Sequence, residues 1–350
     1  MIIWDRKKKI ILIVIIIVAI LGIGTGVWAY FHFKKKDTTN KIPVNFSGTK
    51  TACLLDGTSV SKDLAKRHPL AVMVENHPAA RPQAGLSKAS IIYEAIAEGG
   101  ITRFMLLFSC YDADKVGPVR SARTYFVDWA EEYNAFYAHA GGAQNALTKI
   151  VEDNVLDLNH NSTAFWRQND GRALEHTLYT TTPKLYQYAQ DSGYDINSSD
   201  FIPWKFKTDI AASQRPTQGK GAIIDFSNSD TYKVKWTYDP KSNMYLRELS
   251  GTAQKDENTN KQLEAKNIII AAYTRSAVES GGKTVYDFNT IGSGEIKVLM
   301  DGTVIEGTWK KDKAKTRTKF YDKNSQEIKF NPGTTWIEIV NPDTGGVTIQ

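Results

Sequence analysis

The sequence predicts an α+β protein preceded by one transmembrane helix. Three observations carry this prediction. They are an uncharged apolar run near the N-terminus, strand-like runs followed by helical spacing in the first half, and short β-rich runs separated by turns in the second half. A length of 350 residues leaves room for two ordinary domains.

The first element is the apolar run from Ile10 to Phe33. Its 24 positions carry no charge, and a helix of that length reaches about 36 Å, enough to cross a bilayer. The run is too long for a cleaved signal peptide and ends in aromatic residues typical of a membrane interface. We therefore expect a cytoplasmic tail over 1–9, a signal anchor over 10–33 and an extracellular body, which makes this a single-pass protein of the cell membrane.

The net charge of +6 belongs to the flanks of this run. Residues 1–36 hold seven basic side chains and one acidic side chain, and the other 314 residues hold 37 of each sign. The body is therefore neutral overall, which argues against a nucleic-acid partner. Cys53 and Cys110 are too few for a disulfide framework or a cysteine-based zinc site, and the sequence leaves their pairing open.

The body divides by its residue patterns. A polar segment over 34–66 is expected to form a stalk. An N-terminal α+β domain is expected over 67–197, with strands near 70–74, 91–97 and 102–110 and further helices near 143–153 and 184–190. The first helix is predicted from one apolar stripe formed by Ala122, Tyr125, Phe126, Trp129, Ala130, Tyr133 and Phe136.

The second half has a different pattern. Short β-rich runs alternate with turns such as Asp239-Pro240, Gly281-Gly282 and Asp301-Gly302. Almost no helical periodicity interrupts them. This pattern predicts a mostly β C-terminal domain over 218–350, joined to the first domain by a linker over 198–217.

Arginine is concentrated in the first domain, where six of the twelve arginines lie between residues 81 and 172. Arg120, Ser121 and Arg123 stand at the predicted helix start, where free backbone N–H groups and the helix dipole favour an anion. The predicted anion-binding residues are Arg81, Arg103, Arg120, Ser121 and Arg123. In the alternative interpretation, these arginines form structural salt bridges with Glu94, Glu98, Asp128 or Glu131.

Three further residues are candidates for acid–base chemistry or metal binding. Glu94 and Glu98 share one face of an extended strand, and His176 follows two arginines closely. The plainer alternative is that one carboxylate holds Arg103, the other faces water, and His176 is structural. Because no nucleophile or metal set is recognisable, the sequence leaves open whether the protein is an enzyme.

Several motifs, in one order over residues 54–340, resemble the YerB-like family of Gram-positive surface proteins, which are mostly lipoproteins. They include Asn76-x-Pro78-x-x-Arg81-Pro82-Gln83, Glu98-Gly99-Gly100-Ile101-Thr102-Arg103, Gly117-Pro118-Val119-Arg120-Ser121-Ala122-Arg123 and Gly307-Thr308-Trp309-Lys310. The resemblance implies an N-terminal module of layered ββα type and a separate β-rich module, and it supplies no catalytic residues. Many members are anchored through a lipidated cysteine, whereas this chain offers a helix. Similar sequences show Pro-His-Asn where this chain has Glu175-His176-Thr177.

The sequence therefore predicts a membrane-anchored extracytoplasmic protein that binds a phosphate-bearing envelope component through its arginines. The expected partners are the membrane, a glycopolymer or lipid pyrophosphate, and a protein docking on the β domain. One alternative is a non-enzymatic interaction scaffold at the cell surface. Another is an envelope hydrolase or transferase using Glu94, Glu98 and His176. No cofactor, metal or nucleic acid is expected.

Overall fold

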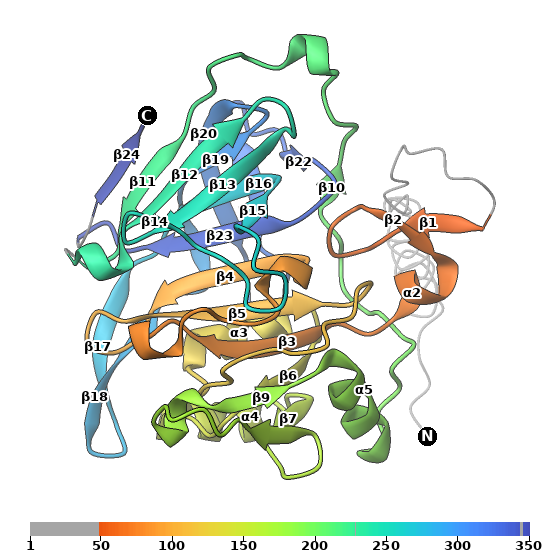
Figure 1. Ribbon diagram of the computed structural model, residues 1–350, viewed down its shortest axis with the longest axis vertical. Coiled ribbons are helices and arrows are strands. Elements are labelled where there is room, and N and C mark those ends of the chain that lie inside the picture. Colours follow the sequence, from red (N-terminus) through yellow and green to blue (C-terminus); the bar gives the residue numbers. More distant parts are fainter. Residues whose placement is uncertain (1–48, 228, 344–345) are drawn as a thin grey trace, which may run out of the picture. The chain divides into compact units, whose positions relative to one another are not determined.

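The computed structural model describes residues 49–227, 229–343 and 346–350, and strands dominate it (Figure 1). The largest sheet has ten strands. Their spatial order is β21 (Lys319–Asp322), β20 (Thr303–Lys311), β19 (Gly292–Met300), β16 (Asn267–Ala272), β23 (Thr335–Val340), β4 (Ile91–Ile96), β5 (Thr102–Phe108), β3 (Leu70–Glu75), β6 (Phe136–His139) and β7 (Asp157–Asn159). The first five strands of this order come from the C-terminal half of the chain, and the last five come from the N-terminal half.

The two halves meet where β23 pairs with β4 in parallel. Every residue of β3, β4 and β5 is buried, as expected for central strands covered on both faces. These three strands confirm the runs predicted near 70–74, 91–97 and 102–110. Pairing satisfies the backbone groups that β4 and β23 would otherwise expose at a sheet edge, so the predicted modules share one sheet.

Different elements cover the two faces of this sheet. On one face, α3 (Thr124–Glu131) and α4 (Gln144–Glu152) contribute Trp129 and Ile150 to a buried apolar cluster. On the other face, α5 (Thr182–Asp191) and a second sheet contribute Leu185 and Trp236 to another cluster. The second sheet consists of β14 (Thr252–Ala253), β13 (Met244–Leu249), β12 (Val234–Asp239), β11 (Ala222–Asp225) and β24 (Gly346–Ile349), with β15 (Glu264–Ala265) also paired to β13.

The other described strands form four two-stranded sheets. These are β1 (Lys50–Ala52) with β2 (Ser59–Ser61), β8 (Phe165–Arg167) with β9 (Leu178–Thr180), β10 (Lys205–Phe206) with β22 (Lys329–Phe330), and β17 (Arg275–Ser280) with β18 (Lys283–Phe288). The β17–β18 hairpin extends along the side of the molecule next to α3 (Figure 1). A short helix, α2 (Lys62–Lys66), follows β2.

The first predicted helix is shorter than its apolar stripe. It ends at Glu131, and Asn134 adopts a left-handed backbone conformation with φ of 48°. That turn lets Phe136 begin β6 beside β3 instead of continuing the helix. Ser121 was expected at the start of the helix, where its side chain could cap it, but the N-cap position is Arg123, and its side chain makes no capping hydrogen bond.

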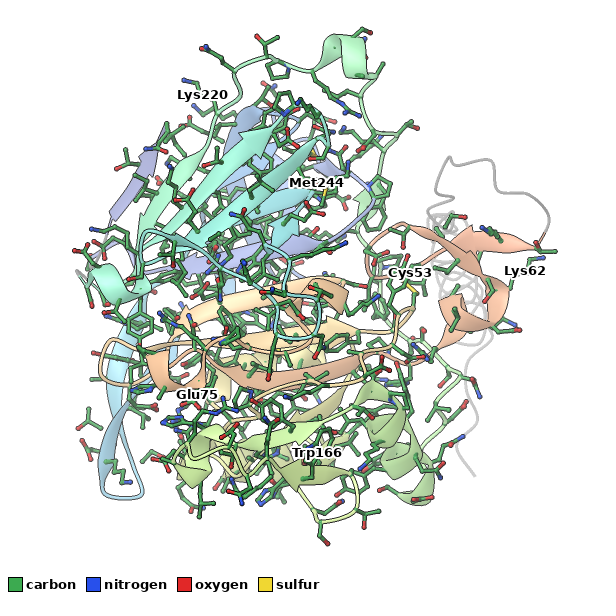
Figure 2. All side chains as sticks on the ribbon, in the orientation of Figure 1. Cys53, Lys62, Glu75, Trp166, Lys220 and Met244 are labelled. Atoms are coloured by element: carbon green, nitrogen blue, oxygen red, sulfur yellow. A yellow bond between two sulfur atoms is a disulfide. The ribbon has the colours of Figure 1, made fainter. Side chains whose placement is uncertain are left out.

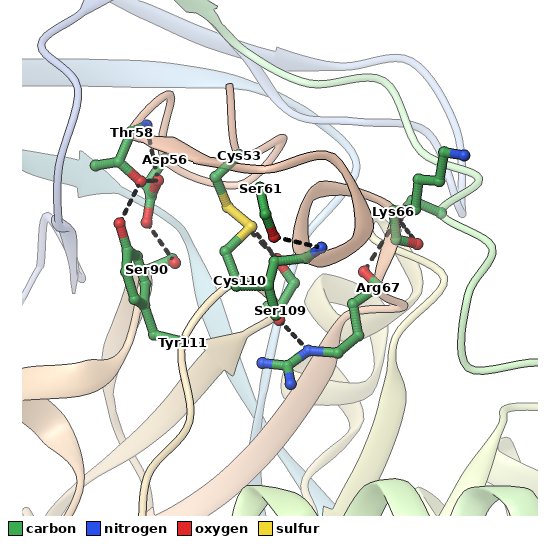
Figure 3. Close-up of a disulfide and its surroundings, with 12 residues drawn as sticks. Cys53, Asp56, Thr58, Ser61, Lys66, Arg67, Ser90, Ser109, Cys110 and Tyr111 are labelled. Atoms are coloured by element: carbon green, nitrogen blue, oxygen red, sulfur yellow. Dashed lines mark hydrogen bonds between the residues drawn. A yellow bond between two sulfur atoms is a disulfide. The ribbon is translucent and has the colours of Figure 1, made fainter. Parts of the chain in front are cut away.

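The segment 34–66, predicted as a polar stalk, differs from that expectation where the structure describes it. Residues 50–66 carry β1, β2 and α2, and a disulfide joins Cys53 to Cys110 after β5 (Figure 3). Asp56 adds a 2.6 Å hydrogen bond from Ser90. The cross-link fixes this polar segment to the sheet, which composition alone could not reveal.

The predicted transmembrane segment 10–33 lies outside the described residues, as does the tail 1–9. Within 49–227, 229–343 and 346–350, no helix is both long enough and apolar enough to cross a membrane.

Candidate functional site

A buried charged triad lies where the two halves of the chain meet. Glu94 on β4 and Glu338 on β23 occupy paired positions on the neighbouring strands. Arg247 on β13 reaches both: its Nη1 donates to Glu338 Oε1 at 2.6 Å, and its Nη2 donates to Glu94 Oε2. All three side chains are fully buried. The Arg247 guanidinium also lies close to two indole rings, 5.0 Å from the centroid of Trp236 and 4.1 Å from that of Trp336.

The two carboxylates of the triad have different hydrogen-bond environments. Glu94 Oε1 accepts hydrogen bonds from Asn76 Nδ2 and Thr102 Oγ1 at 3.1 and 2.6 Å. Glu338 Oε2 has no hydrogen-bond partner among the described residues. Burial raises the pKa of Glu338 to about 8, with Arg247 opposing and the charge of Glu94 reinforcing that shift. Two carboxylates and one guanidinium therefore hold a proton at neutral pH.

Beside the triad, a cavity of about 530 Å³ lies between the two halves of the chain. We call it the seam cavity. It is lined by Arg81, Pro82 and Gln83 from the N-terminal half and by Leu249, Ser250, Thr252, Ala253, Gln254, Lys255 and Asn260 from the C-terminal half. Two of these residues are cationic and none is acidic, so the lining suits an anionic ligand with hydrogen-bonding groups.

Arg81 has no carboxylate of the described residues within 4.0 Å, unlike Arg103, Arg120 and Arg123. Its Nη2 donates to the backbone oxygens of Asn76 and Thr231 at 3.0 and 3.1 Å. Its guanidinium carbon lies 5.2 Å from the ring centroid of Tyr232. Burial lowers the pKa of Arg81 from its ordinary value. The positive charge is thus held in place without being neutralised by an ion pair.

Two glutamines connect the seam cavity to the triad. Gln254 Oε1 accepts from Arg247 Nε at 2.6 Å, and Gln254 Nε2 donates to Gln83 Oε1 at 3.3 Å. Gln83 Nε2 in turn donates to Asn76 Oδ1 at 2.9 Å. One continuous hydrogen-bond network therefore links the cavity wall to the buried charges.

Arg103, Ser121 and Arg123 lie elsewhere, grouped around Glu98. Arg123 Nη2 donates to Glu98 Oε2 at 2.6 Å, and Arg103 Nη2 lies 4.0 Å from the same oxygen. Burial would raise the pKa of Glu98, but the hydrogen bond and charge of Arg123 and the charge of Arg103 bring it below the ordinary value. Burial lowers the pKa of Arg103 to about 10, and the charge of Arg123 adds to that shift.

This group opens onto a second cavity of about 640 Å³, which we call the hairpin cavity. Its walls come from the start of α4 and from the β17–β18 hairpin, and its lining is Glu98, Ser121, Arg123, Gly142, Ala143, Gln144, Ser280, Gly281, Lys283, Thr284 and Val285. The Arg123 guanidinium already binds a carboxylate here. An anion entering this cavity would have to compete with Glu98.

Arg120 and His176 meet at a third place, on opposite oxygens of Glu75. Arg120 Nε lies 2.9 Å from Glu75 Oε1, and His176 Nδ1 lies 2.8 Å from Glu75 Oε2. Glu75 is the last residue of β3 and is labelled in Figure 2. The predicted set Glu94, Glu98 and His176 is therefore not brought together, because the three side chains have separate partners. No group of three or more His, Cys, Asp or Glu in the part of the chain that the structure describes could hold a metal ion.

Sequence reasoning did not find Arg247, Glu338, Gln254 or Lys255. The sequence did contain a signal for Arg247. It occupies the same buried face of β13 as Tyr245 and Leu249, two residues away on either side. A charged residue at an apolar position of an alternating strand predicts a buried partner. No comparable local signal marks Lys255, an exposed residue that forms an isolated β-bridge with Gln262.

The chain matches two models of one family. The model for the N-terminal domain described as "Protein of unknown function (DUF3048)" matches residues 55–195, and the model for its C-terminal domain matches residues 222–337. The first match covers the half of the chain that supplies β3 to β7 of the ten-stranded sheet, and the second covers the half that supplies β16 to β23.

A relative from Bacillus subtilis (strain 168), named "Putative lipoprotein YerB", is 32% identical over 318 residues, which cover 90% of this chain and 90% of the relative. The crystal structure of the YerB protein from Bacillus subtilis has a similar fold, with a TM-score of 0.76 and 31% identity. That likeness covers 85% of this chain and 100% of the other. Both findings confirm the YerB-like resemblance of the sequence motifs.

Proposed function

The chain belongs to the DUF3048 family, and we propose that it is a membrane-tethered binding protein outside the cytoplasm. In this proposal, the seam cavity holds an anionic group of a cell-envelope component, such as a lipid pyrophosphate or a glycopolymer phosphate. The single observation that carries the proposal is Arg81, a partly buried arginine without a carboxylate partner that faces a cavity without acidic lining residues.

The remaining lining supports the same ligand class. Lys255 adds a second positive charge, and Gln83, Gln254 and Asn260 offer amide groups to hydroxyl or phosphate oxygens. Because Gln83 and Gln254 are held by the network behind them, the cavity wall is fixed before a ligand arrives. A fixed wall lowers the ordering cost of binding. Of the five predicted anion-binding residues, this proposal keeps Arg81 as the direct ligand.

Attachment to the membrane is part of the proposal. The apolar run 10–33 supplies a spanning helix, and the name of the Bacillus subtilis relative describes a lipoprotein. Here both cysteines of the sequence are joined in the disulfide, so neither sulfur is available for a lipid. A disulfide is also typical of an oxidising compartment outside the cytoplasm. We therefore favour the helix as the anchor, with the body on the outer side.

The test is calorimetric titration of the full-length protein in detergent with inorganic pyrophosphate. The wild-type protein should bind at one site, and Arg81→Gln should weaken binding by more than tenfold. Lys255→Gln should weaken it less, because Lys255 is exposed and its charge is screened by water. Binding should also weaken as salt is added.

The matched control is Arg215→Gln. Arg215, like Arg81, donates to two backbone oxygens, those of Pro240 and Lys241, but it does not line the seam cavity. This variant should bind pyrophosphate as the wild type does. Equal affinity of wild type and Arg81→Gln, or no binding by the wild type, would remove the seam cavity as a phosphate site.

A second candidate function, a non-enzymatic interaction scaffold, is favoured by one observation. Arg120 and Arg123 are paired with Glu75 and Glu98, as the alternative interpretation of the arginines requires. If pyrophosphate does not bind, this scaffold function becomes the working proposal, and cross-linking at the cell surface is the experiment that follows.

A further inference from the structure

Glu75 fixes the position of two side chains that come from distant segments. Arg120 precedes α3, and His176 ends the short 3-10 helix Leu174–His176 between β8 and β9. The carboxylate is almost fully buried, and it contacts both groups at hydrogen-bond distance. His77, two residues after Glu75, stacks on His176 with ring centroids 4.9 Å apart and planes 9° apart.

The hydrogen bonds of the two imidazoles set opposite tautomers. An ionised carboxylate only accepts hydrogen bonds, so His176 Nδ1 carries the proton that it donates to Glu75, and its Nε2 keeps a lone pair. His77 Nδ1 instead accepts from the backbone N–H of Ala79 at 3.2 Å, so its proton lies on Nε2. The stacked pair therefore offers a base, His176 Nε2, and a neutral hydrogen-bond donor, His77 Nε2–H.

Both outward nitrogens are available to a substrate. Among the described residues, no group hydrogen-bonds Nε2 of either ring or the terminal amino groups of Arg120. The side chains of His176 and Arg120 are 10% and 26% exposed, so solvent reaches both. Glu175 lies at the surface and interacts electrostatically with Arg120, His77 and His176.

We propose that His77, His176 and Arg120 form a hydrolytic site for uncharged carboxylic esters. An uncharged ester fits the local charge, because Glu75 and Glu175 offset Arg120. Acyl transfer also fits the spacing better than phosphoryl transfer does. In acyl transfer the attacking and leaving oxygens are bound to one carbon, so one imidazole can take a proton from the first and return it to the second, whereas phosphoryl transfer places these oxygens in line on opposite sides of phosphorus.

The reaction is a simple hydrolysis in which atoms and charges balance. His176 Nε2 takes a proton from water as the water oxygen forms a bond to the acyl carbon. The carbonyl oxygen becomes an oxyanion next to the Arg120 amino groups. The bond between the acyl carbon and the alcohol oxygen then breaks, and that oxygen takes from the His176 imidazolium the proton that came from water, while His77 Nε2–H donates a hydrogen bond to the same oxygen. Both imidazoles end in their starting states, and the carboxylic acid product loses its proton to solvent.

The experiment measures hydrolysis of p-nitrophenyl acetate by the full-length protein in detergent. The wild type should turn over many equivalents, and His176→Gln should lower kcat by about 10²- to 10⁴-fold. His77→Gln should lower kcat less, because His77 supplies a hydrogen bond and no proton. Glu75→Gln should lower kcat too, because a glutamine amide can donate to Nδ1 and move the proton of His176 to Nε2. Glu75 is thus a positioning residue. His160→Gln, a change of an exposed histidine elsewhere, is the matched control and should keep the wild-type rate.

Long-range ¹H–¹⁵N correlation spectra give a second readout that does not depend on turnover. They should place the proton of His176 on Nδ1 and that of His77 on Nε2, and Glu75→Gln should reverse the tautomer of His176. A wild-type rate in His176→Gln, or the same tautomer on both rings in the wild type, would overturn the proposal. Failure here leaves the seam cavity unaffected, because Arg81 and Lys255 take no part in this site.

Discussion

Glu94 and Glu338 lie side by side on parallel strands, one from each half of the chain, and share the guanidinium of Arg247. Two buried carboxylates at paired positions would repel each other strongly if both were ionised, and when Glu338 holds a proton the charge of Glu94 still requires a buried cation. Arg247 therefore offsets the negative charge where β4 pairs with β23. This pairing is the one that joins the two halves of the chain into one sheet.

Removing the cation should destabilise the protein severely. Arg247→Met keeps most of the side-chain volume but leaves two carboxylates buried without their common partner. We expect a loss of about 3–5 kcal/mol in the free energy of unfolding, the usual cost of breaking a buried ion pair. Urea denaturation at neutral pH measures this loss.

Two companion variants make that result interpretable. Lys235→Met removes a surface cation from the neighbouring strand β12, where the Lys235–Glu248 pair is partly exposed to water, and should change stability little. Glu94→Leu and Glu338→Leu, combined with Arg247→Met, should recover much of the loss, because apolar groups replace the charges. A small loss in Arg247→Met alone would show that the triad contributes little to joining the halves.

The raised pKa of Glu338 predicts a pH-dependent stability. Its value of about 8 in the folded protein lies above the ordinary value near 4.5, so the folded state holds a proton that the unfolded state has lost between these limits. The contribution of Glu338 to the free energy of unfolding is therefore greatest below about pH 4.5. It declines as pH rises to about 8, by at most about 1.4 kcal/mol per pH unit. Denaturation curves from pH 5 to 9 test this decline, and Glu338→Gln should flatten it. An unchanged pH profile in that variant would assign the decline to other groups.

Much of the local structure could be predicted from the sequence, because its causes are local. The apolar runs of β3, β4 and β5 are continuous in the sequence, and their burial follows from composition. The pairing of β23 with β4 could not be predicted, because nothing local specifies which strand edge meets which. The end of α3 was also missed, since its apolar stripe continues into β6 and only the backbone turn at Asn134 separates the two.

The site was predicted only in part for the same reason. Arginine enrichment directed attention to Arg81, Arg103, Arg120 and Arg123, but the sequence could not say which carboxylate, if any, each would meet. In the fold, three of them lie beside Glu75 or Glu98, and Arg81 alone among the four has only uncharged partners within 4.0 Å. The partners come from other strands and turns, so only the tertiary structure separates an arginine without a carboxylate partner from a paired one.

The ion pair between Glu98 and Arg123 should matter far less than the triad. The Glu98 side chain is 35% exposed, so water screens the attraction, and Glu98→Gln should cost about 1 kcal/mol or less at neutral pH. The pKa of Glu98 is lowered in the folded protein, so its contribution is present above the ordinary value and is lost as pH falls through the folded value. The difference between wild type and Glu98→Gln in urea denaturation should therefore shrink from pH 7 to pH 3. A difference that grows in acid would contradict the lowered pKa.

The disulfide between Cys53 and Cys110 should be a major source of stability for the folded body. It joins positions 57 residues apart, and closing a loop of that length in the unfolded chain contributes about 4 kcal/mol in the chain-entropy model. The double variant Cys53→Ala, Cys110→Ala should lose most of that amount in urea denaturation. Wild-type protein treated with dithiothreitol should lose a similar amount, whereas the double variant should not respond to the reductant. If reduced wild type, shown by thiol titration to have two free thiols, unfolds at the same urea concentration as the oxidised protein, then β1, β2 and α2 are held to the sheet by their packing and by hydrogen bonds such as that of Asp56 with Ser90.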